Sequence, residues 1–354
     1  MATTTRDEHV GRRVRTANRM ASGPRQVVWV KWWAGVGALY LAFCAFLIVA
    51  WVASGDFQRT TVGSDSPPHW MRVLARLNEI GTLLVVVVIA YFVILRPWRR
   101  ERRLSLDGTI LIAGMSVVFL DLFQAYFRPW FTYNTVLTNF GSWGNHVPGL
   151  ITPHANMFAE PTLWLLAAFP MWYMIGIGLG GVMLRKLAAR WPNTGIPGRL
   201  LSILVPLIVL DLVIEVFWVR SGLFSIPGAW GPTLFKGHYY QFPIAEAVCS
   251  GALWTSVIAL RYFKNDRGET FAERGLDEFR GDRKRAGLRL LAIIGAVNVL
   301  SFVVYYVPVA LLGSKADPWI DDIVRNRSYL TSQLCGHGTD YVCTAPGWHR
   351  AGQP

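Results

Sequence analysis

Acidic side chains inside long apolar segments are the residues of this sequence best suited to chemistry. Asp211 and Glu215 lie four residues apart in an apolar run at 200–219, and Asp121 lies in another at 108–127. Residues at i and i+4 share one face of a helix, and two acids so close in a low dielectric cannot both ionise cheaply. At least one is therefore expected to keep its proton at neutral pH. Because acid catalysis requires such a group, we predict that all three acids are catalytic.

Further polar and aromatic residues surround these acids in the sequence. Glu79, Glu160 and Glu246 each open an apolar run, and the loops before the last two runs are rich in Gly, Pro, Trp and Tyr. If the apolar runs cross a bilayer, these groups all fall at or beyond its outer half. The predicted substrate-binding residues are Arg128, Tyr133, Asn134, Trp143, His146, His154, Glu160, Arg220, Trp230, His238 and Glu246.

Structural roles remain alternatives for several of these acids. An acid in the first turn of a helix is favoured by the helix dipole, and Pro suits the first helical position, as in Glu160-Pro161. Asp121 and Asp211 could also serve only to pair with Arg128 or Arg220.

The elements that must position these residues are seven long apolar runs. Such runs cross a hydrocarbon core about 30 Å thick as helices, since lipid offers no partner for open backbone groups. The composition agrees, with 53% hydrophobic and 16% charged residues. We predict an all-α polytopic membrane protein of about seven transmembrane helices. The runs are 28–54, 79–95, 108–127, 162–184, 200–219, 245–263 and 288–313.

Basic residues indicate how this bundle is oriented. Most of the 35 Lys and Arg residues fall before the first run and in alternate loops after it. This pattern predicts a cytoplasmic N-terminus, an outer C-terminus and a multi-pass plasma-membrane protein. The net charge of +13 is then explained by orientation and contact with anionic lipid, so no nucleic-acid partner is expected.

The predicted organisation follows from these boundaries. Residues 1–26 form a disordered basic tail, 27–313 the bundle with aromatic outer loops at 129–161 and 221–244, and 314–354 an outer tail. A cleavable signal peptide at the first run is an alternative to a membrane anchor. A faint duplication relates the two loop regions, for example Leu120-Asp121-Leu122 and Leu210-Asp211-Leu212, and suggests parallel repeats.

Neither a metal ion nor a cofactor is predicted. Carboxylates with histidines can hold metals, but the Glu-x-x-His pairs of di-metal bundles do not occur. Metalloprotease and serine-hydrolase motifs are also absent from the sequence. Cys335 and Cys343, in the predicted outer tail, are expected to form a disulfide under oxidising conditions. A zinc site with His337 and His349 is the alternative.

One region resembles a known family. The sequence Phe127-Arg128-Pro129-Trp130-Phe131-Thr132-Tyr133-Asn134, followed by Asn139-Phe140-Gly141-Ser142-Trp143-Gly144, Val147-Pro148-Gly149 and Glu160-Pro161, resembles the AveC-type spirocyclases. These are actinobacterial integral-membrane proteins. The resemblance is clearest over about 120–161 and extends more loosely over the bundle.

The resemblance implies spiroketal closure, in which a hydroxyl attacks a hemiketal carbon while an acid expels water. Asp211 or Glu215 would then be the proton donor and Asp121 the stabiliser of the cation. Tyr133, Asn134, Trp143 and His146 would line the mouth of the pocket.

The sequence thus favours a cofactor-free cyclase or dehydratase acting on a lipophilic polyketide, lipid or steroid-like substrate. Two alternatives remain. The first is a protein that binds or transports a lipophilic molecule without chemistry. The second is a subunit of an envelope complex that docks through its aromatic loops.

Overall fold

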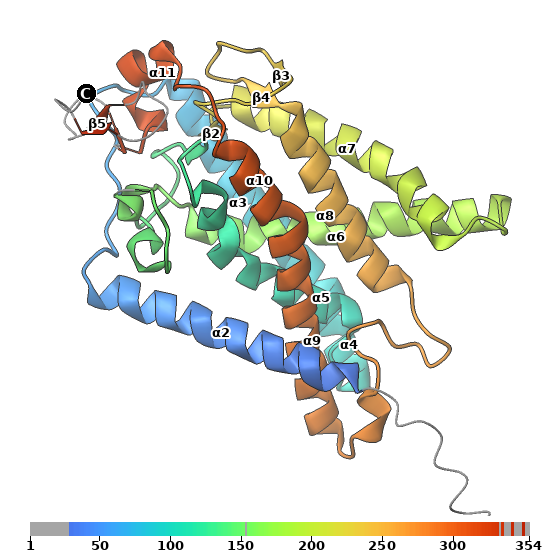
Figure 1. The fold of residues 1–354 in the computed structure, drawn as a ribbon. Coiled ribbons are helices and arrows are strands. Elements are labelled where there is room, and N and C mark those ends of the chain that lie inside the picture. Colours follow the sequence, from blue (N-terminus) through green and yellow to red (C-terminus); the bar gives the residue numbers. More distant parts are fainter. Residues whose placement is uncertain (1–27, 153, 333, 336–340, 343–348, 351–354) are drawn as a thin grey trace, which may run out of the picture.

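The structure is a computed structural model that describes residues 28–152, 154–332, 334–335, 341–342 and 349–350. Seven helical segments in this part of the chain are long and apolar enough to cross a membrane. The protein is therefore a helical, polytopic membrane protein, as predicted (Figure 1).

Four of the spans are single α-helices, and the other three also contain a π turn or a 3₁₀ segment. They are α2 (Trp29–Ala53); α3 (His69–Ala90) with the π turn η1 (Tyr91–Leu95) and α4 (Arg96–Glu101); α5 (Leu106–Ser116) with the 3₁₀ segment η2 (Val117–Ala125); α6 (Thr162–Arg190); α7 (Ile196–Arg220); α8 (Ile244–Tyr262); and α9 (Asp282–Ser301) with the π turn η6 (Phe302–Tyr306) and α10 (Val307–Gly313).

Shorter elements form the connections. They are β1 (Thr132–Tyr133), η3 (Gly144–His146), η4 (Ala155–Met157), β2 (Phe224–Ser225), β3 (Thr233–Leu234), β4 (Phe242–Pro243), η5 (Leu276–Glu278), α11 (Asp321–Asn326), η7 (Ser328–Leu330), β5 (Tyr341–Val342) and β6 (His349–Arg350).

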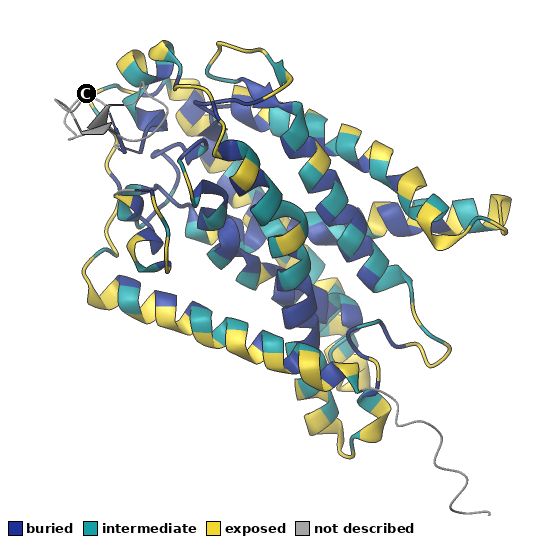
Figure 2. Cartoon of the chain, in the orientation of Figure 1, coloured by how far each residue is buried: buried dark blue, intermediate teal, exposed yellow. Residues whose placement is uncertain are grey.

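The third span, α5 and η2, is the centre of the bundle. The helix α5 packs between α6 and α9, while α2 lies along α9, α3 against α6, and α7 against α8. Exposed positions follow the outer side of α2 (Figure 2), and they include the apolar residues Leu39, Phe46 and Val49. A hydrocarbon environment accommodates such a surface, whereas a water-soluble monomer rarely exposes large apolar patches.

Glycines allow α2 and α9 to approach closely. A Cβ on Gly37 would overlap the backbone of Leu291, and a Cβ on Gly295 would overlap the Trp33 carbonyl oxygen. Small residues at helix contacts are typical of membrane bundles, because association there depends on close packing.

We expect Gly295→Ala to lower the free energy of unfolding by about 1–3 kcal/mol, the usual result of overpacking a tight contact. Gly287 on the same helix is the matched control, since its Cβ would meet no atom within 4 Å. Gly287→Ala should not destabilise the protein, because Ala favours a helix over Gly. Detergent-solubilised unfolding curves measure both, and equal curves for the two variants would contradict this packing.

The second span begins earlier than predicted. Its helix begins at His69, so Glu79 lies within the span and does not open it. Arg76 forms an ion pair with Glu79 and donates to the Val136 carbonyl oxygen at 2.8 Å. The Glu79 carboxylate also accepts from the Thr138 backbone N–H at 2.6 Å. These contacts satisfy the polar groups that interrupt the apolar pattern.

The long loops are folded and lie at one end of the bundle, which we call the loop end (Figure 1). Strand β1 of the first loop pairs antiparallel with β2 of the second, and β3 pairs with β4. Trp130 and Trp143 are fully buried there. The two loops therefore form one layer over the helices.

Part of the C-terminal segment also packs on this layer. Tyr329 and Leu330 are buried, and their backbone oxygens accept hydrogen bonds from Thr135 and Thr132. Cys335 is disulfide-bonded. Cys343, His337 and the predicted tail 1–26 lie outside the described residues.

Candidate functional site

A cavity of about 100 Å³ brings the three predicted catalytic acids together. Asp121, Asp211 and Glu215 line it, together with Glu246. The walls come from η2, α6, α7, α8 and η6, with loop residues such as Phe242 closing one side. None of the described residues that line this cavity is Lys, Arg or His. Four acids thus share an apolar pocket without a neighbouring cationic side chain in its wall.

The third span changes from an α-helix to a 3₁₀ helix in the segment that carries Asp121. The sequence predicted a regular helix to residue 127, but α5 ends at Ser116 and continues as the 3₁₀ segment η2. Residues three apart eclipse one another in a 3₁₀ helix, so Asp121 and Gln124 project to the same side and both line the cavity. The Ser116 hydroxyl donates to the Ala113 carbonyl oxygen, a local bond that competes with the helix ladder.

Hydroxyl groups surround the Asp121 carboxylate. Tyr133 donates to Oδ2 at 3.0 Å, and Tyr306 donates to Oδ1 at 3.5 Å. Glu160 and Gln124 also lie within hydrogen-bonding reach of Asp121. Several hydrogen-bond donors therefore converge on this carboxylate and fix its position.

Glu160 lies just before α6 and can donate a hydrogen bond to Asp121 when it is protonated. Burial raises the pKa of the Glu160 carboxyl well above its usual range, and the nearby charge of Asp121 raises it further. Burial likewise raises the pKa of the Tyr133 phenol, and the nearby charge of Asp121 raises it further. Both groups therefore keep their protons and serve Asp121 as donors.

A second pair of acids faces this one. Glu246 Oε1 accepts from Tyr305 at 2.7 Å and from Ser250 at 3.2 Å, and Asp211 lies within reach of the same Ser250 hydroxyl. Asp121 with Glu160 and Asp211 with Glu246 occupy corresponding places in the two hairpins.

Glu215 lies between the two pairs. It is close enough for the charges of Glu246 and Asp121 to act on it. Its side chain is partly accessible, unlike that of Asp121, and no hydrogen bond from its carboxyl to another described residue is found. Glu215 is therefore the acid of this cavity that is least constrained by the protein.

The π turn η6 was not predicted, and it carries two residues that the sequence analysis missed. Consecutive tyrosines, Tyr305 and Tyr306, reach different acids, Glu246 and Asp121. Single π turns within helices occur frequently at functional sites. The only feature of the sequence that could have indicated these two residues is a pair of tyrosines in an otherwise apolar run.

Four of the tryptophans that line the cavity contact one another in a row along its apolar wall, and these were also missed. The ring centroids of Trp164 and Trp218 are 5.5 Å apart, those of Trp218 and Trp172 5.4 Å, and those of Trp172 and Trp254 5.8 Å. Indole faces attract cations, most strongly where water is excluded. The wall and the acids together favour a positively charged species.

Several polar atoms of the lining have no hydrogen-bond partner among the described residues. They are Gln124 Oε1, Asp211 Oδ2, Glu246 Oε2 and Trp172 Nε1. A buried polar group left unpaired costs about 1–3 kcal/mol. The cavity is therefore suited to a polar ligand or to ordered water, and at about 10–15 Å³ per water it has room for several.

Other predicted binding residues lie away from this cavity. Arg128 donates to the Ala316 carbonyl oxygen at 2.6 Å, and Arg220 stacks on Tyr240. Among the described residues, no ion pair joins either arginine to Asp121 or Asp211. The alternative in which these arginines hold the two aspartates does not fit this geometry.

The remaining predicted residues support the loops. Asn134 binds the Gly222 carbonyl oxygen at 2.7 Å, and Trp143 packs edge-on against Trp51. Trp230 lies edge-on to Trp130. His154 and His238 are exposed. These residues belong to the layer at the loop end and do not line the cavity.

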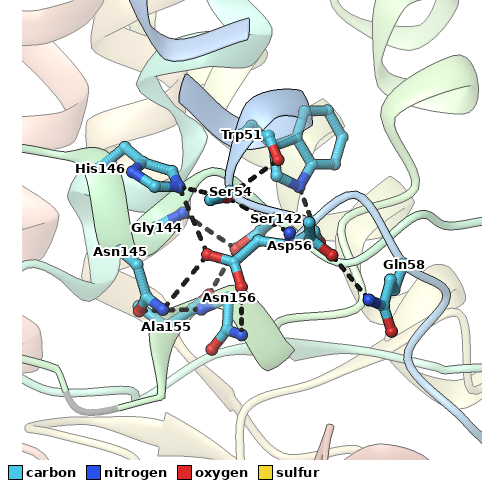
Figure 3. A network of polar contacts seen from close by, with 11 residues as sticks. Trp51, Ser54, Asp56, Gln58, Ser142, Gly144, Asn145, His146, Ala155 and Asn156 are labelled. Atoms are coloured by element: carbon cyan, nitrogen blue, oxygen red, sulfur yellow. Dashed lines mark hydrogen bonds and ion pairs between the residues drawn. The ribbon is translucent and has the colours of Figure 1, made fainter. Parts of the chain in front are cut away.

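His146 belongs to a separate polar network around Asp56 (Figure 3). Its Nε2 lies 3.3 Å from Asp56 Oδ2 and 3.0 Å from Ser54 Oγ, while Asn156 Nδ2 donates to Asp56 Oδ1 at 2.9 Å. A Ser-His-Asp triad requires the serine and the aspartate on different ring nitrogens. Here both contact Nε2, so the network fastens the end of α2 to the first loop and is not a nucleophilic site.

Comparison with known families adds an independent observation. A protein-family model described as spirocyclase AveC-like matches residues 101–329. The chain belongs to the spirocyclase AveC-like family. The match covers well over half of the chain and includes all five acids around the cavity. Searches of curated proteins and of solved structures found no match.

Proposed function

We propose that this AveC-like protein is a membrane enzyme that closes a spiroketal-type ring on a lipophilic substrate by acid-assisted loss of water. The observation that carries the proposal is the cavity itself. Asp121, Asp211, Glu215 and Glu246 face an apolar space walled by tryptophan, with no cationic side chain among the described lining residues. The basic residues before α2 further support a plasma-membrane location with the loop end outside.

The proposed reaction begins with an open-chain ketone that carries two hydroxyl groups. One hydroxyl adds to the carbonyl carbon and forms a hemiketal without net loss of atoms. A carboxylic acid then protonates the hemiketal hydroxyl, the C–O bond breaks, and water leaves an oxocarbenium ion. The second hydroxyl attacks this carbon and gives its proton to a carboxylate. The net change is the loss of one water molecule.

Glu215 is the proposed proton donor. It is partly accessible, it shares a helix face with Asp211, and no hydrogen bond to a described residue restrains it. Asp121 is the proposed stabiliser of the cation, since Tyr133 and Tyr306 hold its carboxylate in place. A preorganised charge costs no reorganisation when the cation forms.

The tryptophan wall is proposed to assist Asp121. Cation–π attraction at a desolvated site contributes about 2 kcal/mol. The wall also excludes bulk water, which would otherwise capture the oxocarbenium ion. The cavity accommodates only the reacting centre of a substrate, so the rest of the molecule must lie elsewhere.

Binding or transport of a lipophilic cation is the second candidate. Acids beside indole rings, with no cationic side chain among the described lining residues, would also suit an organic ammonium group. In that case the open-chain ketone would remain unchanged.

The test uses purified protein in liposomes with a synthetic lipophilic dihydroxy ketone. The proposal expects a product lighter by one water, formed faster than in protein-free liposomes. The matched substrate control lacks one hydroxyl and should stop at the hemiketal. No acceleration over empty liposomes for any chain length of the ketone would contradict the enzyme and favour the second candidate.

A further inference from the structure

A second hollow lies beside the acid cavity. This groove has a volume of about 280 Å³, and its lining includes Phe123, Phe127, Phe302, Tyr306, Val307 and Leu311. Its lining is apolar or aromatic throughout. Phe127 and Leu311 at its edges are 40% and 54% exposed, so the groove opens on the side of the bundle.

Tyr306 separates the groove from the acid cavity. It is the residue common to both linings. Its side chain is almost fully buried, and its hydroxyl donates to Asp121. It ends the π turn η6, where the regular helix ladder is interrupted. One side chain thus borders the apolar groove and contacts the proposed cation stabiliser.

The loop end is closed by packed side chains. Trp130, Phe242 and Ile226 are fully buried in the wall of the cavity there, and the rings of Trp130 and Trp230 are in edge-to-face contact with centroids 4.3 Å apart. A route through this layer would require several aromatic side chains to move. On the side of the groove, by contrast, the described residue Tyr306 lines both hollows.

We propose that the groove holds the apolar arm of the substrate, which reaches the acid cavity sideways from the membrane past Tyr306. The inference rests on the proposed function and adds the substrate class: an amphiphile with a hydroxylated ketone at one end and an alkyl arm at the other. The arm lies between η2 and α10 while the ketone reacts.

The experiment uses a dihydroxy ketone whose alkyl arm carries a terminal diazirine, photolysed with the protein in liposomes. Labelling is expected on groove residues within 123–127 and 302–311. Val307→Trp fills the groove and should lower this labelling about tenfold, as expected when roughly two methylene groups lose their buried contacts. Leu311→Trp, at an exposed edge position, is a second variant that the fold should accommodate.

Val303→Trp is the matched control. Val303 lies one turn before Val307, is exposed and does not line the groove, so labelling should be unchanged. A plain alkyl diazirine without the ketone serves as the probe for ordinary lipid, and its labelling should not distinguish the two variants.

Equal labelling in Val303→Trp and Val307→Trp would overturn the proposal. So would the same tenfold loss with the plain alkyl probe, because the occupant would then be lipid. Glu215→Gln should retain labelling, since arm binding does not depend on proton transfer. Groove labelling without turnover in the unmodified protein would refute the proposed function and leave the groove assignment standing.

Discussion

Glu215→Gln should slow ring closure by about 10²–10⁴-fold, the usual contribution of a positioned general acid. The amide keeps the shape and polarity of the side chain but has no proton of suitable acidity. Binding should change little, so the loss should appear in kcat and not in KM. The assay is product formation from the dihydroxy ketone under saturating substrate.

Glu215→Asp is the informative comparison for this effect. It keeps an acid on the same face as Asp211 but withdraws it by one methylene group, so intermediate activity is expected. If Glu215→Gln were as active as the unmodified protein, Glu215 would not be the proton donor. Asp211, one turn before it on α7, would then be the next acid to replace.

Asp121→Asn should slow ring closure by about 10²–10³-fold, because removing one preorganised electrostatic stabiliser typically has this effect. The amide oxygen can still accept from one of the two tyrosines that now donate to the carboxylate, and the amide NH2 can donate to the hydroxyl oxygen of the other, so the fold should persist. The charge that offsets the oxocarbenium ion would be gone. Single-turnover rates measure this loss separately from product release.

Asp107→Asn is the matched control for Asp121→Asn. Asp107 opens the same span at the opposite end, where it pairs with Arg261. Its replacement should lower stability slightly and leave the single-turnover rate unchanged. Equal losses in the two variants would indicate that Asp121 acts only through the packing of its helix.

The sequence was sufficient to predict the helical bundle and the convergence of the acids. Long apolar runs specify helices in lipid, and the spacing of Asp211 and Glu215 places both on one face. Asp121 could be added because it lies at a similar depth in its own span. These inferences use only helix geometry and the cost of charge in a membrane.

The partners of those acids could not be predicted. Tyr305 and Tyr306 contact different acids because they lie in a π turn, and no residue pattern predicts such a turn. Trp172 and Trp218 lie in apolar runs, where an inward tryptophan and a lipid-facing one are indistinguishable. His146 was assigned to the pocket because loop residues cannot be placed before the loops are known to fold over the bundle.

The start of the second span was misplaced for a related reason. Arg76 and Glu79 interrupt the apolar pattern, and the sequence does not reveal that they pair with each other and with the first loop. Helix ends near a folded loop depend on such contacts between distant segments.

The most direct test of the account is inhibition of ring closure by a lipophilic cyclic ammonium ion that imitates the oxocarbenium ion, compared with its neutral carbon isostere. Acids and indole rings around the cavity should favour the charged inhibitor by about 30-fold, equivalent to roughly 2 kcal/mol. Asp121→Asn should reduce that preference. Equal inhibition by the charged and neutral molecules would contradict a site built to stabilise a cation.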